Sequence, residues 1–147
     1  MTIEKRAAVS DADATLARWQ AEEDAVRARL GEPGVAGAGQ VRGRTGLETL
    51  QAIFDGELPR PPIGDTLDFL PIHMEHGASV FQGKPQRRHY NPLGSVRALT
   101  DAVALVRAEG KLIHLGRRVA TAEARLVGPD GKLYAHATTT CLIFDQP

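Results

Sequence analysis

Two histidines and a glutamate stand close together in the middle of the chain, as His73, Glu75 and His76. Imidazole nitrogens and carboxylates are common ligands of transition metals. The surrounding residues are typical of a strand, in which side chains three positions apart point to opposite faces. His73 and His76 are therefore poorly placed to share one ion, and the sequence predicts no metal site.

Nucleophilic or acid–base chemistry would need a reactive thiol or a positioned carboxylate. The single cysteine, Cys141, lies in an apolar segment without an activating charge nearby, which predicts an inert core thiol. Asp68, Glu109 and Glu123 stand on predicted strands. Any of the three could act as a general base. The alternative is that each simply faces solvent, and the sequence favours none of them as a base.

Two basic clusters could bind phosphate, because guanidinium groups donate paired hydrogen bonds to phosphate oxygens. Arg117 and Arg118 follow Gly116 at a predicted turn between two strands, and Arg87–His89 form the second cluster. The alternative for both clusters is a solvated, charged turn.

The elements that must position these residues begin with a helix predicted over 11–30, which Ser10 caps and Gly31 ends. Its apolar stripe is thin and is broken by Glu23, so we expect it to dock on another element with Trp19 as its anchor. The glycine-rich stretch 31–45 is predicted to be a linker.

A second, short helix begins at a capping box formed by Thr45 and Glu48. Gly56 ends it, and the prolines that follow prevent its continuation.

The rest of the chain is predicted to form strands, with Pro71 marking an edge or a bulge and Gly110 a bulge or a bend. Turns are expected near Glu75–Gly77 and at Gly128–Gly131. The predicted strands cover 67–74, 78–83, 101–115, 119–127 and 133–144.

Helices followed by antiparallel strands indicate an α+β fold. We expect two parts, an N-terminal helix and linker over 1–45 and a main domain over 46–147. Ala120, Ala122 and Ala124 line one face of their strand, which is typical of a sheet crossed closely by a helix. The first helix could fold back onto that alanine face.

Two long runs of the sequence resemble hotdog-fold thioesterases of the phenylacetic acid degradation (PaaI-like) type. The first half of that family is similar to the run PRPPIGDTLDFLPIHMEHGASVFQGKPQRRHYNPLGSV. The last three strands of the family are similar to the run RALTDAVALVRAEGKLIHLGRRVATAEARLVGPDGKLYAHATTTCLIF. The most specific parts are HYNPLG at 89–94 and GRRVATAEA at 116–124, and the resemblance covers roughly 46–144.

The sequence departs from the family pattern between these runs. In the family, a segment like Leu93–Val96 continues into a His-Gly-Gly signature, a long central helix and a strand. Here Val96 is followed directly by Arg97. The resemblance therefore implies a hotdog-type sheet that lacks its central helix, with roughly forty residues of typical element length absent.

The resemblance implies hydrolysis of acyl-CoA thioesters with aryl-acetyl, hydroxyaryl or medium-chain acyl groups. Asn91 would hold the attacking water or the thioester, and Gly94 would lie beside the oxyanion site. Gly116, Arg117 and Arg118 would approach the phosphates of coenzyme A. The family's acid and its helix N-terminus both belong to the absent segment. The alternative is therefore a non-catalytic remnant that binds coenzyme A weakly or pairs with an intact hotdog partner.

Composition narrows the remaining classes of function. Eighteen basic residues balance eighteen acidic ones over 147 residues, so no bulk charge favours nucleic acid or an anionic membrane. One cysteine and no apolar N-terminal stretch predict a cytoplasmic protein. We expect coenzyme A thioester as substrate, no cofactor, and a homo-oligomer, because hotdog proteins are usually dimers or tetramers.

Overall fold

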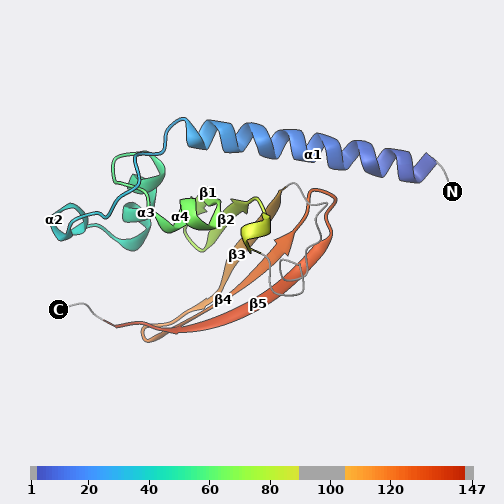
Figure 1. Ribbon diagram of the computed structural model, residues 1–147. Helices are drawn as coiled ribbons and strands as arrows, with labels where there is room; N and C mark the ends of the chain where they lie inside the picture. Colours follow the sequence, from blue (N-terminus) through green and yellow to red (C-terminus); the bar gives the residue numbers. More distant parts are fainter. Residues whose placement is uncertain (1–2, 90–104, 145–147) are drawn as a thin grey trace.

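The computed structural model describes residues 3–89 and 105–144. Helices precede the strands along most of the chain, which confirms the α+β class (Figure 1). No helix in the described ranges is long and apolar enough to cross a membrane. The elements are α1 (Ile3–Arg27), α2 (Ala38–Val41), α3 (Gly46–Phe54), α4 (Ile63–Leu67), β1 (Phe69–Glu75), β2 (Ala78–Gly83), the 3₁₀ helix η1 (Arg87–His89), β3 (Val106–Leu115), β4 (Val119–Val127) and β5 (Leu133–Leu142).

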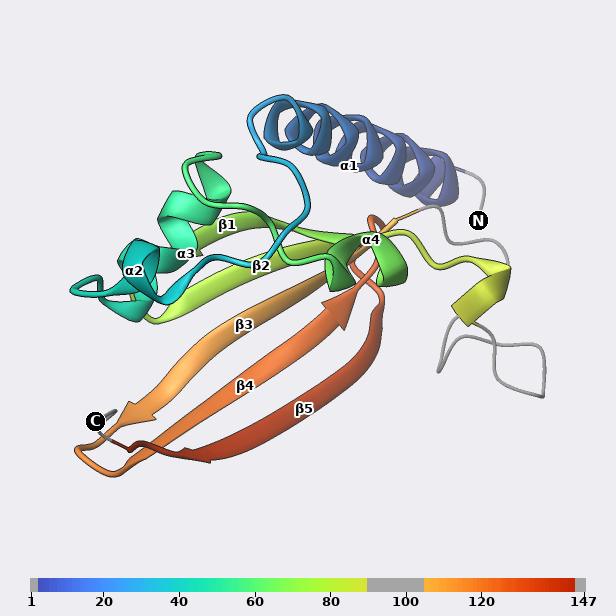
Figure 2. The same ribbon diagram turned by 60° about the vertical axis from the view of Figure 1, so that its left-hand side comes forward.

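The five strands form one sheet in the order β1-β2-β3-β4-β5, and every neighbouring pair is antiparallel (Figure 2). β1 lies at an edge, and its pairing with β2 shifts between Pro71 and His73. Both features expected of Pro71 are therefore confirmed, since proline cannot donate a ladder hydrogen bond. The turn before β2 uses Gly77 at a φ of 83°.

Of the bulge or bend expected at Gly110, the bulge is not observed. Gly110 pairs regularly with Ser79 on one side and Ala124 on the other. A Cβ on Gly110 would lie 3.0 Å from the Ser79 hydroxyl oxygen, so the glycine allows close packing instead. The shift in the β3–β4 pairing lies between Leu112 and His114.

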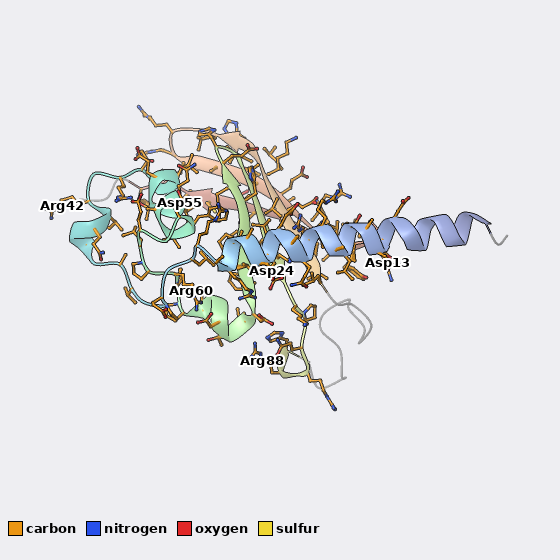
Figure 3. All side chains as sticks on the ribbon, turned by 90° about the horizontal axis from the view of Figure 1, so that it is seen from above. Asp13, Asp24, Arg42, Asp55, Arg60 and Arg88 are labelled. Carbon is orange, nitrogen blue, oxygen red and sulfur yellow. The ribbon has the colours of Figure 1, made fainter. Side chains whose placement is uncertain are left out.

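Helix α1 begins at Ile3, well before the predicted cap at Ser10. The residues that precede Ser10 include Glu, Lys, Arg and Ala, which are good helix formers, so the helix has no local reason to start later. Figure 3 shows Asp13 on the part of α1 that projects beyond the sheet, whereas Asp24 lies over the sheet. The linker predicted after this helix contains the short helix α2.

Trp19 anchors α1 to the sheet, as expected. It is 5% exposed and forms the core cluster with Leu105 and Val127. The Arg107 guanidinium lies 4.5 Å from the centre of the indole ring, within the range of a cation–π contact.

The face that α1 covers is not the alanine face. Gln82, Arg107 and Val127 stand opposite one another on β2, β3 and β4, so they share the face that meets α1. Ala120, Ala122 and Ala124 lie at even positions of β4 and point to the other face. The expectation that the first helix folds onto the alanines is therefore wrong.

Helices α3 and α4 pack on β1, and α4 lies in front of β1 and β2 in Figure 2. The helices thus gather around the β1–β2 side of the sheet. At the opposite edge nine of the ten residues of β5 are exposed. Cys141 is among them, so the predicted core thiol is a surface thiol.

Candidate functional site

Asn91 and Gly94 lie outside the described residues, so their roles stay predictions. The chain leading to them is described as far as His89, in η1. The Gln86 N–H donates to Nδ1 of His89 over 3.2 Å, and the Gln86 side-chain amide donates to the Asp68 carboxylate. The approach to the HYNPLG motif is therefore tied to the start of β1.

Gly116, Arg117 and Arg118 form the turn between β3 and β4, as predicted. The Gly116 N–H donates to the Val119 carbonyl over 2.8 Å. A Cβ at Gly116 would lie 3.0 Å from Nε2 of His114 and 3.2 Å from the Val119 carbonyl oxygen, so a side chain there would be tightly packed. Both arginine side chains are exposed.

The two arginines border a shallow surface hollow whose remaining walls are apolar. Leu142, Ile143 and Phe144 form these walls, and Phe144 is 78% exposed. The Ile143 N–H donates to the Arg118 carbonyl over 2.9 Å, which fixes the end of β5 beside the turn. Cations next to an exposed aromatic ring can take a ligand that combines phosphate groups with apolar or ring-shaped parts.

The two parts of the predicted site lie at opposite ends of β3. His89 shares a surface hollow with Val106, the first residue of β3, whereas Gly116 follows Leu115, the last. Ten residues of strand span roughly 30 Å at the usual rise. Figure 2 shows η1 and the β3–β4 turn at the two ends of the sheet. One copy of the chain therefore does not bring the His89 end of the predicted site next to the arginine turn.

Among the three carboxylates considered from sequence, Asp68 differs from the others. It follows α4 in the left-handed conformation, with φ at 51° and ψ at 54°, and it is the only non-glycine residue with positive φ in the described ranges. Its side chain is 22% exposed and lies 3.6 Å from the Arg27 guanidinium. Non-glycine residues in this conformation are strained, and strain of this kind often accompanies a function. Sequence patterns carry no signal for it.

Glu109 is exposed, and Glu123 faces His136 with 3.3 Å between Oε2 and Nε2. A similar pair joins His73 to Glu75 at 3.3 Å. Within the described residues no group of three potential metal ligands gathers at one point.

A polar network joins α1 to the sheet in an otherwise apolar contact. Gln82 is fully buried, and its amide nitrogen donates to the Trp19 carbonyl over 3.2 Å and to Glu23 over 2.7 Å. Arg107 donates from Nε to the Gln82 side-chain oxygen over 2.9 Å and also pairs with Glu22. Glu23, which interrupts the apolar stripe in sequence, is thus a buried link between α1 and β2.

A cavity lies on the other side of the same corner of the molecule. We call it the β1 cavity; its volume is 460 Å³. Its apolar walls come from α3, α4, β1 and β2, and five charged side chains also line it. Among the residues that the sequence offers for chemistry, Asp68 lines it, whereas Gly116, Arg117 and Arg118 do not.

Comparison with known proteins supports the fold and leaves the activity open to experiment. No family model and no curated protein sequence matches the chain. A phenylacetic acid degradation-related protein from Ralstonia eutropha JMP134, described as a candidate thioesterase, has a similar structure. The TM-score is 0.55 at 22% identity, covering 64% of this chain and 98% of that one. A mutant of the phenylacetic acid degradation protein PaaI from Thermus thermophilus is also similar, with a TM-score of 0.50 and 23% identity. The match covers 56% of this chain and 99% of that one.

The chain has a hotdog-type α+β fold. At these identities the likeness concerns the fold alone. The hotdog assignment implied by HYNPLG and GRRVATAEA is confirmed at that level. The predicted junction at Val96–Arg97 lies outside the described residues, so the absence of the central helix stays a prediction.

Proposed function

We propose that this protein hydrolyses acyl-CoA thioesters, releasing coenzyme A and a free acid. The observation that carries the proposal is the fold, because the antiparallel sheet with its helices is similar in structure to two phenylacetic acid degradation proteins. The sequence motifs at 89–94 and 116–124 support the same activity. The acyl groups proposed are aryl-acetyl, hydroxyaryl or medium-chain.

In this proposal Asn91 holds the attacking water or the thioester, and the backbone at Gly94 borders the developing oxyanion. Fixed donors at that point would stabilise the transition state more than the ground state, which is what accelerates the reaction. Arg117 and Arg118 would bind the phosphates of coenzyme A, and Phe144 offers an apolar surface beside them.

The separation along β3 supports a site shared by two copies of the chain. The turn at Gly116–Arg118 and the segment entering the 89–94 motif stand at opposite ends of a ten-residue strand. In a two-fold dimer the arginine turn of one copy can approach the 89–94 motif of the other. We therefore propose that the active form is a homo-oligomer.

Thiol release from a panel of acyl-CoA substrates tests the activity, using chain that shows a cooperative melt. We expect release above background that is lost in Asn91→Ala and kept in Gln20→Ala, an amide control on the exposed side of α1. No release from folded protein, or equal release from both variants, would contradict the proposal.

The arginine turn needs its own test. Changing both Arg117→Ser and Arg118→Ser should raise KM for acyl-CoA about tenfold or more, since each charge-assisted phosphate contact contributes roughly 1.5–3 kcal/mol. The same variant should leave KM unchanged for a short acyl thioester that lacks phosphates. An equal effect on both substrates would show that the turn does not recognise coenzyme A phosphates.

A second function, a non-catalytic partner domain, is favoured by one observation. β5 is an edge strand in the described sheet with nine of ten residues exposed, and such edges pair readily with another chain. Native mass spectrometry with titration of a non-hydrolysable acyl-CoA analogue, combined with the thiol-release assay on acyl-CoA, separates the two. Assembly with weak binding and no turnover would favour the partner domain, and turnover would favour the enzyme.

A further inference from the structure

The β1 cavity lies at the corner where the end of α1 and the helices α3 and α4 meet β1 and β2. Phe69, Met74 and Phe81 form its floor on β1 and β2. Leu50 of α3 and Ile63 of α4 form the wall across from the sheet. The two phenylalanine rings meet edge to face with their centres 5.8 Å apart. The cavity therefore has a rigid aromatic base and walls from two separate helices.

The volume suits a small molecule larger than one aromatic ring. An apolar protein cavity of roughly 150 Å³ holds benzene, and ligand sites commonly measure about 300–1,000 Å³. The β1 cavity has 460 Å³.

Both arginines that line the cavity are paired with carboxylates, and Glu32 also lines it. Arg60 pairs with Asp65, and its Nε donates to the Gly31 carbonyl over 3.0 Å. Arg27 lies 2.7 Å from Glu23 and 3.6 Å from Asp68. Figure 3 shows Arg60 beside α4, below the end of α1. An anionic ligand would have to compete with the carboxylates that already pair with Arg27 and Arg60, whereas a neutral ligand would leave these pairs in place.

Apolar side chains at this site are exposed to solvent. Ile63 is 57% exposed and Leu50 is 44% exposed. Removing apolar surface from water is favourable, so a ligand that covers these side chains gains binding free energy from both.

We propose that the β1 cavity binds a neutral, largely apolar small molecule about the size of a two-ring aromatic compound. The site is separate from the 89–94 motif and the arginine turn, and its occupancy does not depend on the thioesterase proposal.

Fluorescence titration with phenylnaphthylamine, a neutral two-ring probe, tests the site in the full chain. We expect saturable binding with one site per chain. Ile63→Asp should weaken it about tenfold or more, because the ligand would then desolvate a charge. The matched control is Ile113→Asp, since Ile113 lies on β3 outside the cavity and is 56% exposed. Non-saturable binding, or equal loss in both variants, would overturn the proposal.

A second variant and a second probe make the test independent of Ile63. Met74→Trp should fill the cavity and abolish binding in protein that keeps its far-UV circular dichroism. Anilinonaphthalene sulfonate has similar rings and one negative charge, so it should bind at least about tenfold more weakly than the neutral probe. Equal or tighter binding of the anion would show that Arg27 and Arg60 serve an anionic ligand, and unchanged binding in Met74→Trp would place the probe elsewhere.

Discussion

At the residue scale, local hydrogen bonds explain features that the sequence motifs predict only in part. The capping box at the start of α3 forms as expected, with the Glu48 N–H donating to the Thr45 hydroxyl and the Thr45 N–H donating to the Glu48 carboxylate. Asp68 shows the reverse case. Its left-handed backbone and its bonds to Arg27 and Gln86 depend on partners far along the chain, which no local motif reports.

Glu48 should give α3 a pH-dependent start. The backbone N–H and then the hydroxyl of Thr45, with a smaller effect from Arg44, hold the pKa of Glu48 below its ordinary value of 4.5. Because the pKa of Glu48 is lower in the folded state, its interactions stabilise the fold at pH values above the pKa of the unfolded state. This stabilisation is lost as the pH falls through the pKa of the folded state. Carbon NMR titration of the Glu48 carboxyl measures it. Thr45→Ala should keep the larger part of the shift, because the backbone N–H remains, and complete loss would contradict this.

Substitutions at Asp68 should separate backbone strain from side-chain bonding. Asp68→Ala should lower the free energy of unfolding by about 1–3 kcal/mol, since it keeps the strain and loses both partners. Asp68→Gly should lose about 1 kcal/mol less, because glycine adopts positive φ freely. Asp68→Asn should stay closest to the wild type, because asparagine tolerates this conformation and can still accept from Gln86. Urea denaturation measures the order, and a Gly variant less stable than Ala would contradict it.

At the element scale, the contact between α1 and the sheet is the feature that could least be predicted from the sequence. Its anchor, Trp19, could be predicted because a lone tryptophan on a thin apolar stripe favours a docked helix. Its partner face could not, since Gln82 meets Glu23 across 59 residues of chain. In the sequence, Glu23 interrupts the apolar stripe. Its burial is explained only by its amide and guanidinium partners in the folded chain.

Removing the anchor should weaken the whole contact. Trp19→Ala should lower the free energy of unfolding by about 3–5 kcal/mol, the usual cost of deleting a buried aromatic side chain. Trp19→Phe should lose clearly less, because a ring still fills the space between Leu105 and Val127. Chemical denaturation followed by far-UV circular dichroism measures both, with Val35→Ala as the surface control, since Val35 is 87% exposed. A loss below about 1 kcal/mol in Trp19→Ala would show that α1 adds little stability.

The elements predicted best were those whose signals are local. The strand over 119–127 and the turn at Gly128–Gly131 were predicted as observed, because alternation and turn residues act within a few positions. Helix α4 was missed, since five residues after a proline run are too few to show a helical period. The arginine turn was placed correctly between its strands. Its distance from the 89–94 motif depends on the length of β3 and on sheet order, which only the fold shows.

At the scale of the whole molecule, the helices cover only the β1–β2 side of the sheet, and this has consequences for assembly. Helices gather over β1 and β2, whereas β5 presents its edge and most of its side chains to solvent. Leu142 and Phe144 are exposed at the end of this edge, next to the arginine turn. A second copy that covered this end would bury apolar surface and bring another set of residues toward the arginines. The proposed division of the site between two copies rests on that geometry.

Mixing two variants that are each impaired in a different part of the site tests whether one site needs two copies. Chain with Asn91→Ala and chain with both Arg117→Ser and Arg118→Ser are unfolded and refolded together. Random two-fold pairing makes half of the dimers mixed, and each mixed dimer holds one intact site and one doubly altered site. At substrate concentrations well below KM the mixture should therefore regain about a quarter of the wild-type rate. Activity equal to the mean of the two separate variants would show that each copy carries a complete site, and that the arginine turn and the 89–94 motif do not meet across an interface.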